Sequence, residues 1–309
     1  MSLMQGLKQE LMTTLRVQDV RLHRQDGRWR LEWQRPSAPA GLSLLTLLND
    51  LPSLPPLTAA LGQADDGQPV LLDLRSDPSP HLLVAGGPAA GKTTLLRAIA
   101  LSLALSNPQA QLQMLLLELA GVRGPAARRG PALADLNDLP HLLAPAISDP
   151  SEAMEALRFL VSEMAYRREQ NLTTPAIITL IDDVADLWPA GGEEAGQALS
   201  QLLQRGAAVG IHLVLSTSRP TAAVLGHTFK TLLPARVVGR VADAREARTA
   251  SGRLHSQAEF LAGKGDFAAI LGDKLVYFQG VFVSDHDLAA GLQHLHRHRK
   301  NVLVAGVLT

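Results

Sequence analysis

The stretch GGPAAGKTT at residues 86–94 constrains this chain more than any other, because it fits the pattern G-x-x-x-x-G-K-[ST]. The apolar run HLLVAG at 81–86 leads into it, and a helical pattern follows from Lys92 to about residue 106. A strand, a glycine-containing loop and a helix in this order are the context that a phosphate-binding loop requires. By average residue usage, a chance match in a chain of this size is on the order of one per cent.

Each residue type in the loop has a physical task. Gly86 and Gly91 let the backbone wrap a phosphate chain, whose charge is favoured by the backbone N–H groups and by the helix dipole. We predict that Lys92 reaches the β and γ phosphates of ATP and that Thr93 holds Mg²⁺. The predicted nucleotide-binding set is Gly86, Gly87, Pro88, Ala89, Ala90, Gly91, Lys92, Thr93 and Thr94, and the predicted cofactors are ATP and Mg²⁺.

A second motif, LIDDVADLW at 180–188, ends the apolar run AIITLI with two adjacent carboxylates. An NTPase of this class needs a magnesium-binding carboxylate at the end of a strand downstream of the loop. We therefore predict that Asp182 binds Mg²⁺ together with Thr93, and that Asp183 polarises the attacking water. Taken alone, such a pair can also be a helix N-cap; the loop upstream favours the metal site.

Composition limits the remaining chemistry. The chain has no cysteine, which excludes disulfides, thiolate metal sites and thiol nucleophiles. Its formal net charge is zero, so nucleic-acid binding has to come from local basic patches. No apolar run approaches the roughly 20 residues of a membrane span. We expect a cytoplasmic protein with no membrane segment in this chain.

Apolar strand patterns alternate with helical patterns along most of the 309 residues, which is typical of an α/β domain with a mainly parallel sheet covered by helices. Before it, VRLHRQDGRWRLEW reads as a β-hairpin in a small N-terminal α+β module, and the proline-marked LPSLPPL follows. The predicted division is a module at 1–56, an ATPase domain at 57–290 and a basic tail at 291–309.

Five segments occur in an order that resembles the motor of the FtsK/SpoIIIE DNA-pumping ATPases. They are LGQADDGQPVLLDLRSDPSPHLLVAG, NDLPHLLAPAISDPSEAMEALRFLVSEMAYRRE, IDDVADLW, GAAVGIHLVLSTSRP, and FLAGKGDFAAIL with GVFVSDHDL. The resemblance implies a RecA-like P-loop fold, a hexameric ring of self-associated subunits, ATP between subunits and double-stranded DNA in the centre. Head-to-tail contacts with rotational closure generate such a ring.

Two departures from the family pattern concern hydrolysis. The family usually has Glu where this chain has Asp183, and a misplacement of about 1 Å in a water-positioning group can cost on the order of a hundredfold in rate. The family's sensor glutamine falls at Ser218, whose side chain is too short to span the same distance. We expect a catalytic role at both positions, with slow hydrolysis.

Two further departures concern residues that act across the subunit boundary. The family's trans-acting arginine aligns with Ala207, and its lysine aligns with Ala244. Arg205 and Arg245 lie two and one residues away and are the candidates to replace them.

The DNA signature is weaker than the nucleotide signature. The family carries a long arm before the strand that bears Asp182, and this chain has only QNLTTP there. The basic candidates for DNA are Arg123, Arg128, Arg129 and the tail HLHRHRK at 294–300. Three functions therefore remain open: a ring-shaped DNA translocase, a nucleotide-binding regulatory or scaffold module derived from such a motor, and an ATPase of the protein-secretion type.

Overall fold

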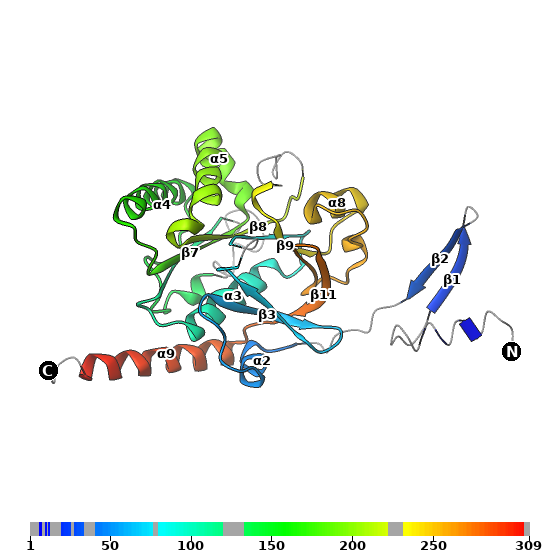
Figure 1. The fold of residues 1–309 in the computed structure, drawn as a ribbon, viewed down its shortest axis with the longest axis horizontal. Coiled ribbons are helices and arrows are strands. Elements are labelled where there is room, and N and C mark those ends of the chain that lie inside the picture. The colour runs from blue at the N-terminus through cyan, green and yellow to red at the C-terminus, as the bar shows by residue number, and fades with distance from the viewer. Residues whose placement is uncertain are drawn as a thin grey trace. The chain divides into compact units, whose positions relative to one another are not determined.

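The computed structural model describes residues 6–7, 10, 12, 20–25, 28–33, 41–76, 80–119, 133–221 and 231–305. The chain divides into two compact units, residues 1–40 and 41–309 (Figure 1). The loop arginines Arg123, Arg128 and Arg129 lie outside the described residues.

The smaller unit contains a β-hairpin. Strand β1 (Val20–Gln25) pairs antiparallel with β2 (Arg28–Trp33), and Gln25 faces Arg28 in the register, so two residues connect the strands. This is the hairpin that the sequence predicts in the N-terminal module.

The division after residue 40 differs from the expected boundary at 56, because helix α2 (Leu44–Asp50) packs on the larger unit. Leu44 and Leu47 are buried in the core of that unit. The N–H of Leu44 also donates to the carbonyl of Phe282, 3.0 Å away. Residues 41–56 therefore belong to the ATPase domain.

A sheet of nine strands forms the centre of the larger unit in the described part of the chain, in the order β4-β3-β11-β10-β9-β5-β8-β7-β6. Neighbouring strands β9, β5, β8, β7 and β6 run parallel, and β10, β11, β3 and β4 add to them in antiparallel fashion. The strands are β3 (Thr58–Ala64), β4 (Pro69–Asp73), β5 (Leu82–Ala85), β6 (Leu112–Glu118), β7 (Ala176–Asp182), β8 (Ile211–Thr217), β9 (Ala235–Gly239), β10 (Asp266–Leu271) and β11 (Lys274–Gly280).

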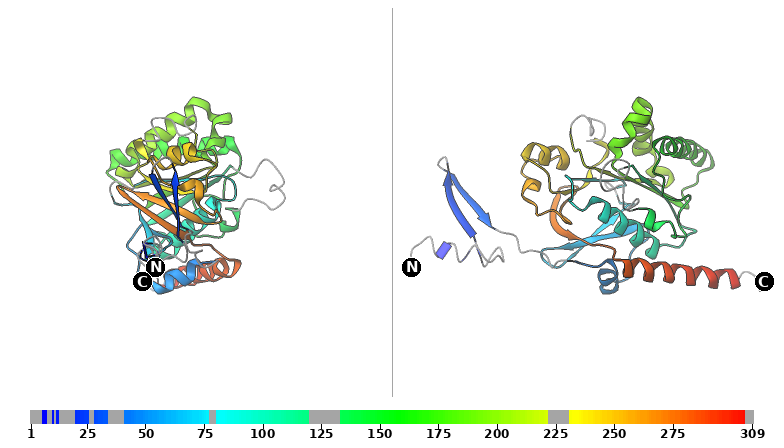
Figure 2. Two further views of the ribbon diagram at one scale, coloured as in Figure 1. Left: turned by 90° about the vertical axis from the view of Figure 1, so that its right-hand side faces the viewer. Right: turned by 180° about the vertical axis from the view of Figure 1, so that it is seen from behind.

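Helices cover both faces of this sheet, as Figures 1 and 2 show. Helices α2, α3 (Lys92–Ser106) and α9 (Asp285–Ala305) lie on one face, and α4 (Pro150–Gln170), α5 (Trp188–Arg205) and α8 (Ala244–Ser251) lie on the other. Short 3₁₀ helices connect them: η2 (Ala134–Leu136), η3 (Val184–Leu187), η4 (Ala207–Val209) and η5 (Ala258–Phe260). Strands β5, β7, β8 and β9 are buried along their whole length, which explains their continuous apolar runs. The predicted α/β fold is confirmed.

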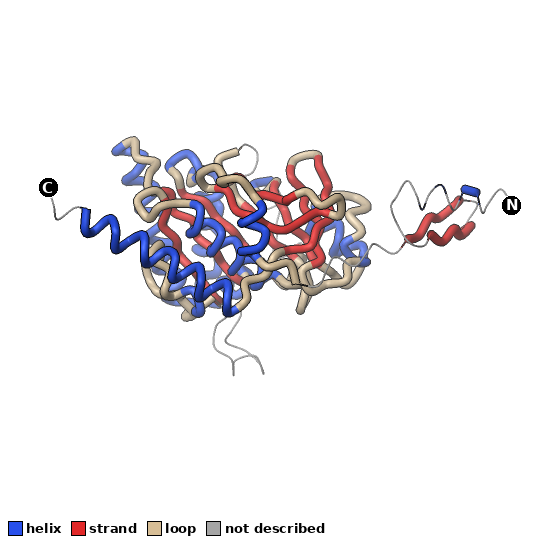
Figure 3. The backbone as a smooth tube through the Cα atoms, turned by 90° about the horizontal axis from the view of Figure 1, so that it is seen from below, coloured by secondary structure: helices blue, strands red, loops and turns tan. Residues whose placement is uncertain are grey.

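Helix α9 runs through the expected boundary between the ATPase domain and the tail at residue 290 (Figure 3). Leu288, Leu292 and Leu295 of α9 pack against the core on the α3 face. A Cβ on Gly291 would lie 3.1 Å from a methyl carbon of Leu101, so the helix approaches α3 closely there. The first residues of the expected tail, 291–295, are thus packed on the domain. No helix in the described residues is long and apolar enough to cross a membrane.

The order of the strands decides where a ligand can bind. From β5 the chain passes through α3 to β6 at the edge, returns through β7 and β8, and then places β9 on the other side of β5. Open α/β sheets bind ligands outside the carboxyl ends of their strands where the order reverses in this way. The loop after β5 lies at that point.

Candidate nucleotide-binding site

The loop after β5 is anchored to the strands on both sides of β5. The N–H of Gly86 donates to the carbonyl of Thr217 at the end of β8, 3.2 Å away. The N–H of Gly87 donates to the carbonyl of Arg240, just past β9, over 2.7 Å. A Cβ on Gly87 would lie only 3.3 Å from that same carbonyl oxygen. The loop is therefore held at the carboxyl edge of the sheet by three strands.

A second chain segment, directly before β10, supports the loop. The N–H groups of Lys264 and Gly265 donate to the carbonyls of Ala89 and Ala90, over 3.0 Å and 2.9 Å. Gly91 has φ 101° and forms the N-cap of α3, and a Cβ there would lie 2.7 Å from the nitrogen of Gly265. The second glycine of the motif is thus required by the backbone conformation and by this close approach.

Lys92 is the first residue of α3 and is 7% exposed. Its Nζ donates to the carbonyl of Gly87 over 3.0 Å, so the ammonium group lies inside the loop. Burial lowers the pKa of Lys92 below its usual value, and the carboxylates of Asp182 and Asp183 partly oppose that shift. An anionic phosphate in the loop would stabilise the charged form of this amine.

Thr93 and Asp182 join the loop to strand β7. The Thr93 hydroxyl donates to Oδ2 of Asp182 over 2.5 Å, and Asp182 is 2% exposed. Ser216 on β8 donates to Oδ1 of the same carboxylate, also over 2.5 Å. A hydroxyl and a carboxylate oxygen in contact beside a phosphate loop are the donor types that Mg²⁺ prefers, so these residues fit that ion.

Asp183 follows with a left-handed backbone conformation, φ 56° and ψ 69°. Its N–H donates to the Ser216 hydroxyl over 2.9 Å. Its Oδ1 lies 3.5 Å from the N–H of Ser218, at the long limit of a hydrogen bond. The structure thus brings the predicted residues Lys92, Thr93, Asp182, Asp183 and Ser218 together at one edge of the sheet.

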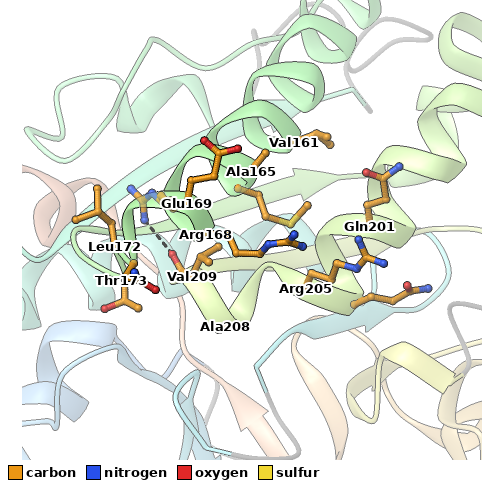
Figure 4. Close-up of a pocket in the computed structure, with 14 residues that line it drawn as sticks. Val161, Ala165, Arg168, Glu169, Leu172, Thr173, Gln201, Arg205, Ala208 and Val209 are labelled. Atoms are coloured by element: carbon orange, nitrogen blue, oxygen red, sulfur yellow. Dashed lines mark hydrogen bonds between the residues drawn. The ribbon is translucent and has the colours of Figure 1, made fainter.

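The two remaining predicted residues lie on α5 and α8. Arg205 ends α5 and lines a groove of about 560 Å³ between α4 and α5. Figure 4 shows Arg168 of α4 and Arg205 of α5 on facing sides of that groove. Arg245 lies exposed in the first turn of α8. Because α5 leads into the start of β8, Arg205 lies at the edge of the sheet opposite to the phosphate loop.

Sequence reasoning missed Ser216, which touches both aspartates, and the ion pair of Arg219 with Asp186. Arg219 Nη2 lies 2.5 Å from Asp186 Oδ1 and ties the segment after β8 to the segment after β7. Asp186 is the third carboxylate of LIDDVADLW, and its place in this motif is a weak indication in the sequence that it has a role at the site. Ser216 has no signal of its own in the sequence, since it lies near the end of an ordinary apolar strand pattern.

The fold and this arrangement of loop lysine, loop threonine and strand-end aspartate define a P-loop NTPase. The FtsK/SpoIIIE family profile matches residues 52–173. DNA translocase SftA of Bacillus subtilis is 32% identical over 263 residues, which cover 78% of this chain and 26% of that protein. DNA translocase SpoIIIE of the same organism is 27% identical over 332 residues, covering 96% of this chain and 40% of that protein.

The chain belongs to the FtsK/SpoIIIE family, as its sequence predicts. It spans less than half the length of these two curated relatives. Solved structures with the same fold include the cytoplasmic domain of the type VII secretion ATPase EccC of Thermomonospora curvata, with TM-score 0.70, 21% identity and coverage of 83% of this chain and 34% of that one. The pCW3 conjugation coupling protein TcpA with ATPγS has TM-score 0.72 and 20% identity, covering 96% of this chain and 86% of that one.

Proposed function

We propose that this chain binds ATP with Mg²⁺ at the loop of residues 86–94, hydrolyses it slowly, and acts on double-stranded DNA as a ring-shaped translocase. The observation that carries the nucleotide part is the contact of Thr93 with Asp182 directly beside the buried amine of Lys92. Membership of a family whose curated relatives are named DNA translocases supports the DNA part.

The residues of the loop would hold the triphosphate by geometry and charge. N–H groups at the start of α3 would donate to the phosphates, and the helix dipole would favour their negative charge. Lys92 would exchange its contact with the Gly87 carbonyl for the β and γ phosphates. Thr93 and Asp182 would hold Mg²⁺, which neutralises charge that develops on the phosphates.

Asp183 is the residue that we assign to the attacking water. It follows Asp182 directly, and its carboxylate is oriented toward the N–H of Ser218. Since Asp is one methylene shorter than the usual Glu, its carboxylate would reach less far toward the phosphates than in the family pattern. This supports slow hydrolysis.

The ring part of the proposal rests on the exposed arginines. Arg205 and Arg245 are on the surface, and Arg205 lines a groove away from the loop of its own subunit, which suits a residue that reaches a neighbour's nucleotide. A heterologous contact repeated around a closed rotation brings one subunit's surface to the next subunit's site. An arginine supplied in this way can contribute about a thousandfold or more in turnover.

The test is ATP turnover with and without long duplex DNA, in the unchanged chain and in Lys92→Ala. Lys274→Ala is the matched control, since Lys274 is exposed at the start of β11. We expect DNA to stimulate turnover in the unchanged chain and the control, and Lys92→Ala to abolish it. If ATP binds but DNA changes nothing, the translocase assignment is wrong.

A second candidate function is a nucleotide-dependent regulatory or scaffold module. It is favoured by the short side chains of Asp183 and Ser218, which stand where the family pattern has Glu and Gln. This candidate predicts ATP binding that Lys92→Ala removes, together with negligible turnover in the presence or absence of DNA.

A further inference from the structure

Ser216 contacts both aspartates of the site. It is the penultimate residue of β8 and is completely buried. Strand β8 runs parallel to β7, with Leu215 beside Ile181, so the next residues of the two strands are Ser216 and Asp182. The side chain is therefore placed by strand pairing and has no access to solvent.

The hydrogen-bond chemistry of this hydroxyl is fully determined by its partners. A backbone N–H can only donate, so Ser216 Oγ accepts from Asp183 N over 2.9 Å. An ionised carboxylate can only accept, so the single Ser216 proton is donated to Asp182 Oδ1 over 2.5 Å. One hydroxyl thus connects the Asp182 side chain to the Asp183 backbone.

These two bonds have different consequences for the two aspartates. The Asp182 carboxylate receives Ser216 on Oδ1 and Thr93 on Oδ2, which restricts rotation about its terminal torsion, a torsion that is otherwise broad. The bond to the Asp183 N–H supports a left-handed backbone that a non-glycine residue adopts uncommonly.

We propose that Ser216 is a positioning residue for magnesium: it orients Asp182 for the ion and holds the backbone of Asp183 beside it. This inference rests on the proposed ATP and Mg²⁺ site. Outer partners of metal-binding carboxylates typically contribute about tenfold to a hundredfold in metal affinity. The hydroxyl of Ser216 meets the requirement for such a partner, because it is buried and donates directly to the ligand.

The test measures how much Mg²⁺ tightens the binding of a fluorescent ATP analogue, as the ratio of dissociation constants in EDTA and in excess Mg²⁺. Turnover is not needed for this readout. Ser216→Ala removes both bonds. Ser216→Cys keeps a similar volume but offers only a weak donor and a weak acceptor. It is the second variant if Ser216→Ala does not fold.

Ser102→Ala is the matched control. Ser102 is a completely buried serine on α3, and its hydroxyl accepts from the N–H of Ala60 over 2.9 Å. This bond joins α3 to β3, so its loss perturbs the core without touching either aspartate.

We expect Ser216→Ala and Ser216→Cys to reduce the Mg²⁺ ratio by about tenfold or more. The dissociation constant in EDTA should stay within about twofold of that of the unchanged chain in every variant. The Mg²⁺ ratio of Ser102→Ala should also stay within about twofold of that of the unchanged chain. Ser216 variants that keep the ratio of the unchanged chain overturn the positioning role and leave the proposed function standing. An unchanged chain that binds no nucleotide, or binds it equally in EDTA and Mg²⁺, overturns both.

Discussion

The Thr93 hydroxyl lies 2.5 Å from Oδ2 of Asp182, so the first turn of α3 meets the end of β7 although 89 residues separate them in the chain. A hydroxyl oxygen and a carboxylate oxygen are thereby placed side by side next to the amine of Lys92.

Thr93→Ala should raise the Mg²⁺ concentration needed for half-maximal ATP turnover by about tenfold or more, because it removes one of the two proposed ligands. Thr93→Ser keeps the hydroxyl and serves as the control, with a much smaller change expected. A Mg²⁺ titration of turnover measures both variants. Equal Mg²⁺ requirements in Thr93→Ala and the unchanged chain would remove Thr93 from the metal site.

Asp183→Glu should raise ATP turnover, by up to about a hundredfold if the shortened side chain is the main defect. The longer side chain brings the carboxylate nearer to the position of the attacking water. Asp273→Glu, at an exposed position between β10 and β11, is the control and should change nothing. An unchanged or lower rate in Asp183→Glu would mean that the site is built around Asp and its left-handed backbone.

Gly91→Ala should destabilise the fold by about 1–3 kcal/mol, because the residue has φ 101° and its Cβ would lie 2.7 Å from the nitrogen of Gly265. Gly196→Ala is the matched control on α5, where a Cβ would meet no atom within 4 Å. There the substitution should stabilise by about 0.4–1 kcal/mol. Urea denaturation measures both, and similar effects at the two glycines would contradict the close approach in the structure.

Acid should destabilise the fold through His81, which is buried at the start of β5 and accepts from the N–H of Leu213 over 3.0 Å. Burial, and the neighbouring His212 to a smaller extent, lower the pKa of His81 from 6.5 to about 4. Between these values the unfolded chain binds a proton that the folded chain does not. The free energy of unfolding therefore falls as pH falls through this window, by at most about 3 kcal/mol.

The variant His81→Gln tests this origin of the acid sensitivity. Its melting temperature should fall less between pH 7 and pH 4.5 than that of the unchanged chain. The control is His286→Gln, because the His286 side chain is 89% exposed, and it should follow the unchanged chain. Identical pH profiles for His81→Gln and the unchanged chain would contradict the assignment.

Arg205→Ala should lower ATP turnover about a thousandfold if the arginine serves a neighbouring subunit, and nucleotide binding should be unaffected. Mixing Arg205→Ala with Lys92→Ala should restore part of the turnover, since a mixed interface combines an intact arginine with an intact loop. The turnover of a mixture of Arg168→Ala with Lys92→Ala tests the other arginine of the groove in the same way. No recovery in the Arg205 mixture would leave no role in trans for Arg205.

The sequence predicts those parts of the site whose residues are neighbours in the chain. Residues 81–106 contain the strand, the loop and the helix in one segment, so their periodicity and the motif spacing are sufficient. The domain boundaries at 56 and 290 differ from the structure, because α2 and α9 are held by contacts with distant strands and helices.

The sequence by itself determined the α/β class, the phosphate loop, the strand-end aspartates and the family. These features are encoded locally, since hydrophobic periodicity and glycine conformation act over a few residues. Only the tertiary structure decided that Ser216 joins Asp182 to Asp183, that residues 264–265 support the loop, and that Arg205 lies away from it. Those relationships depend on the order in which β5, β8, β7 and β9 pair, and strand pairing is set by the packing of the whole sheet.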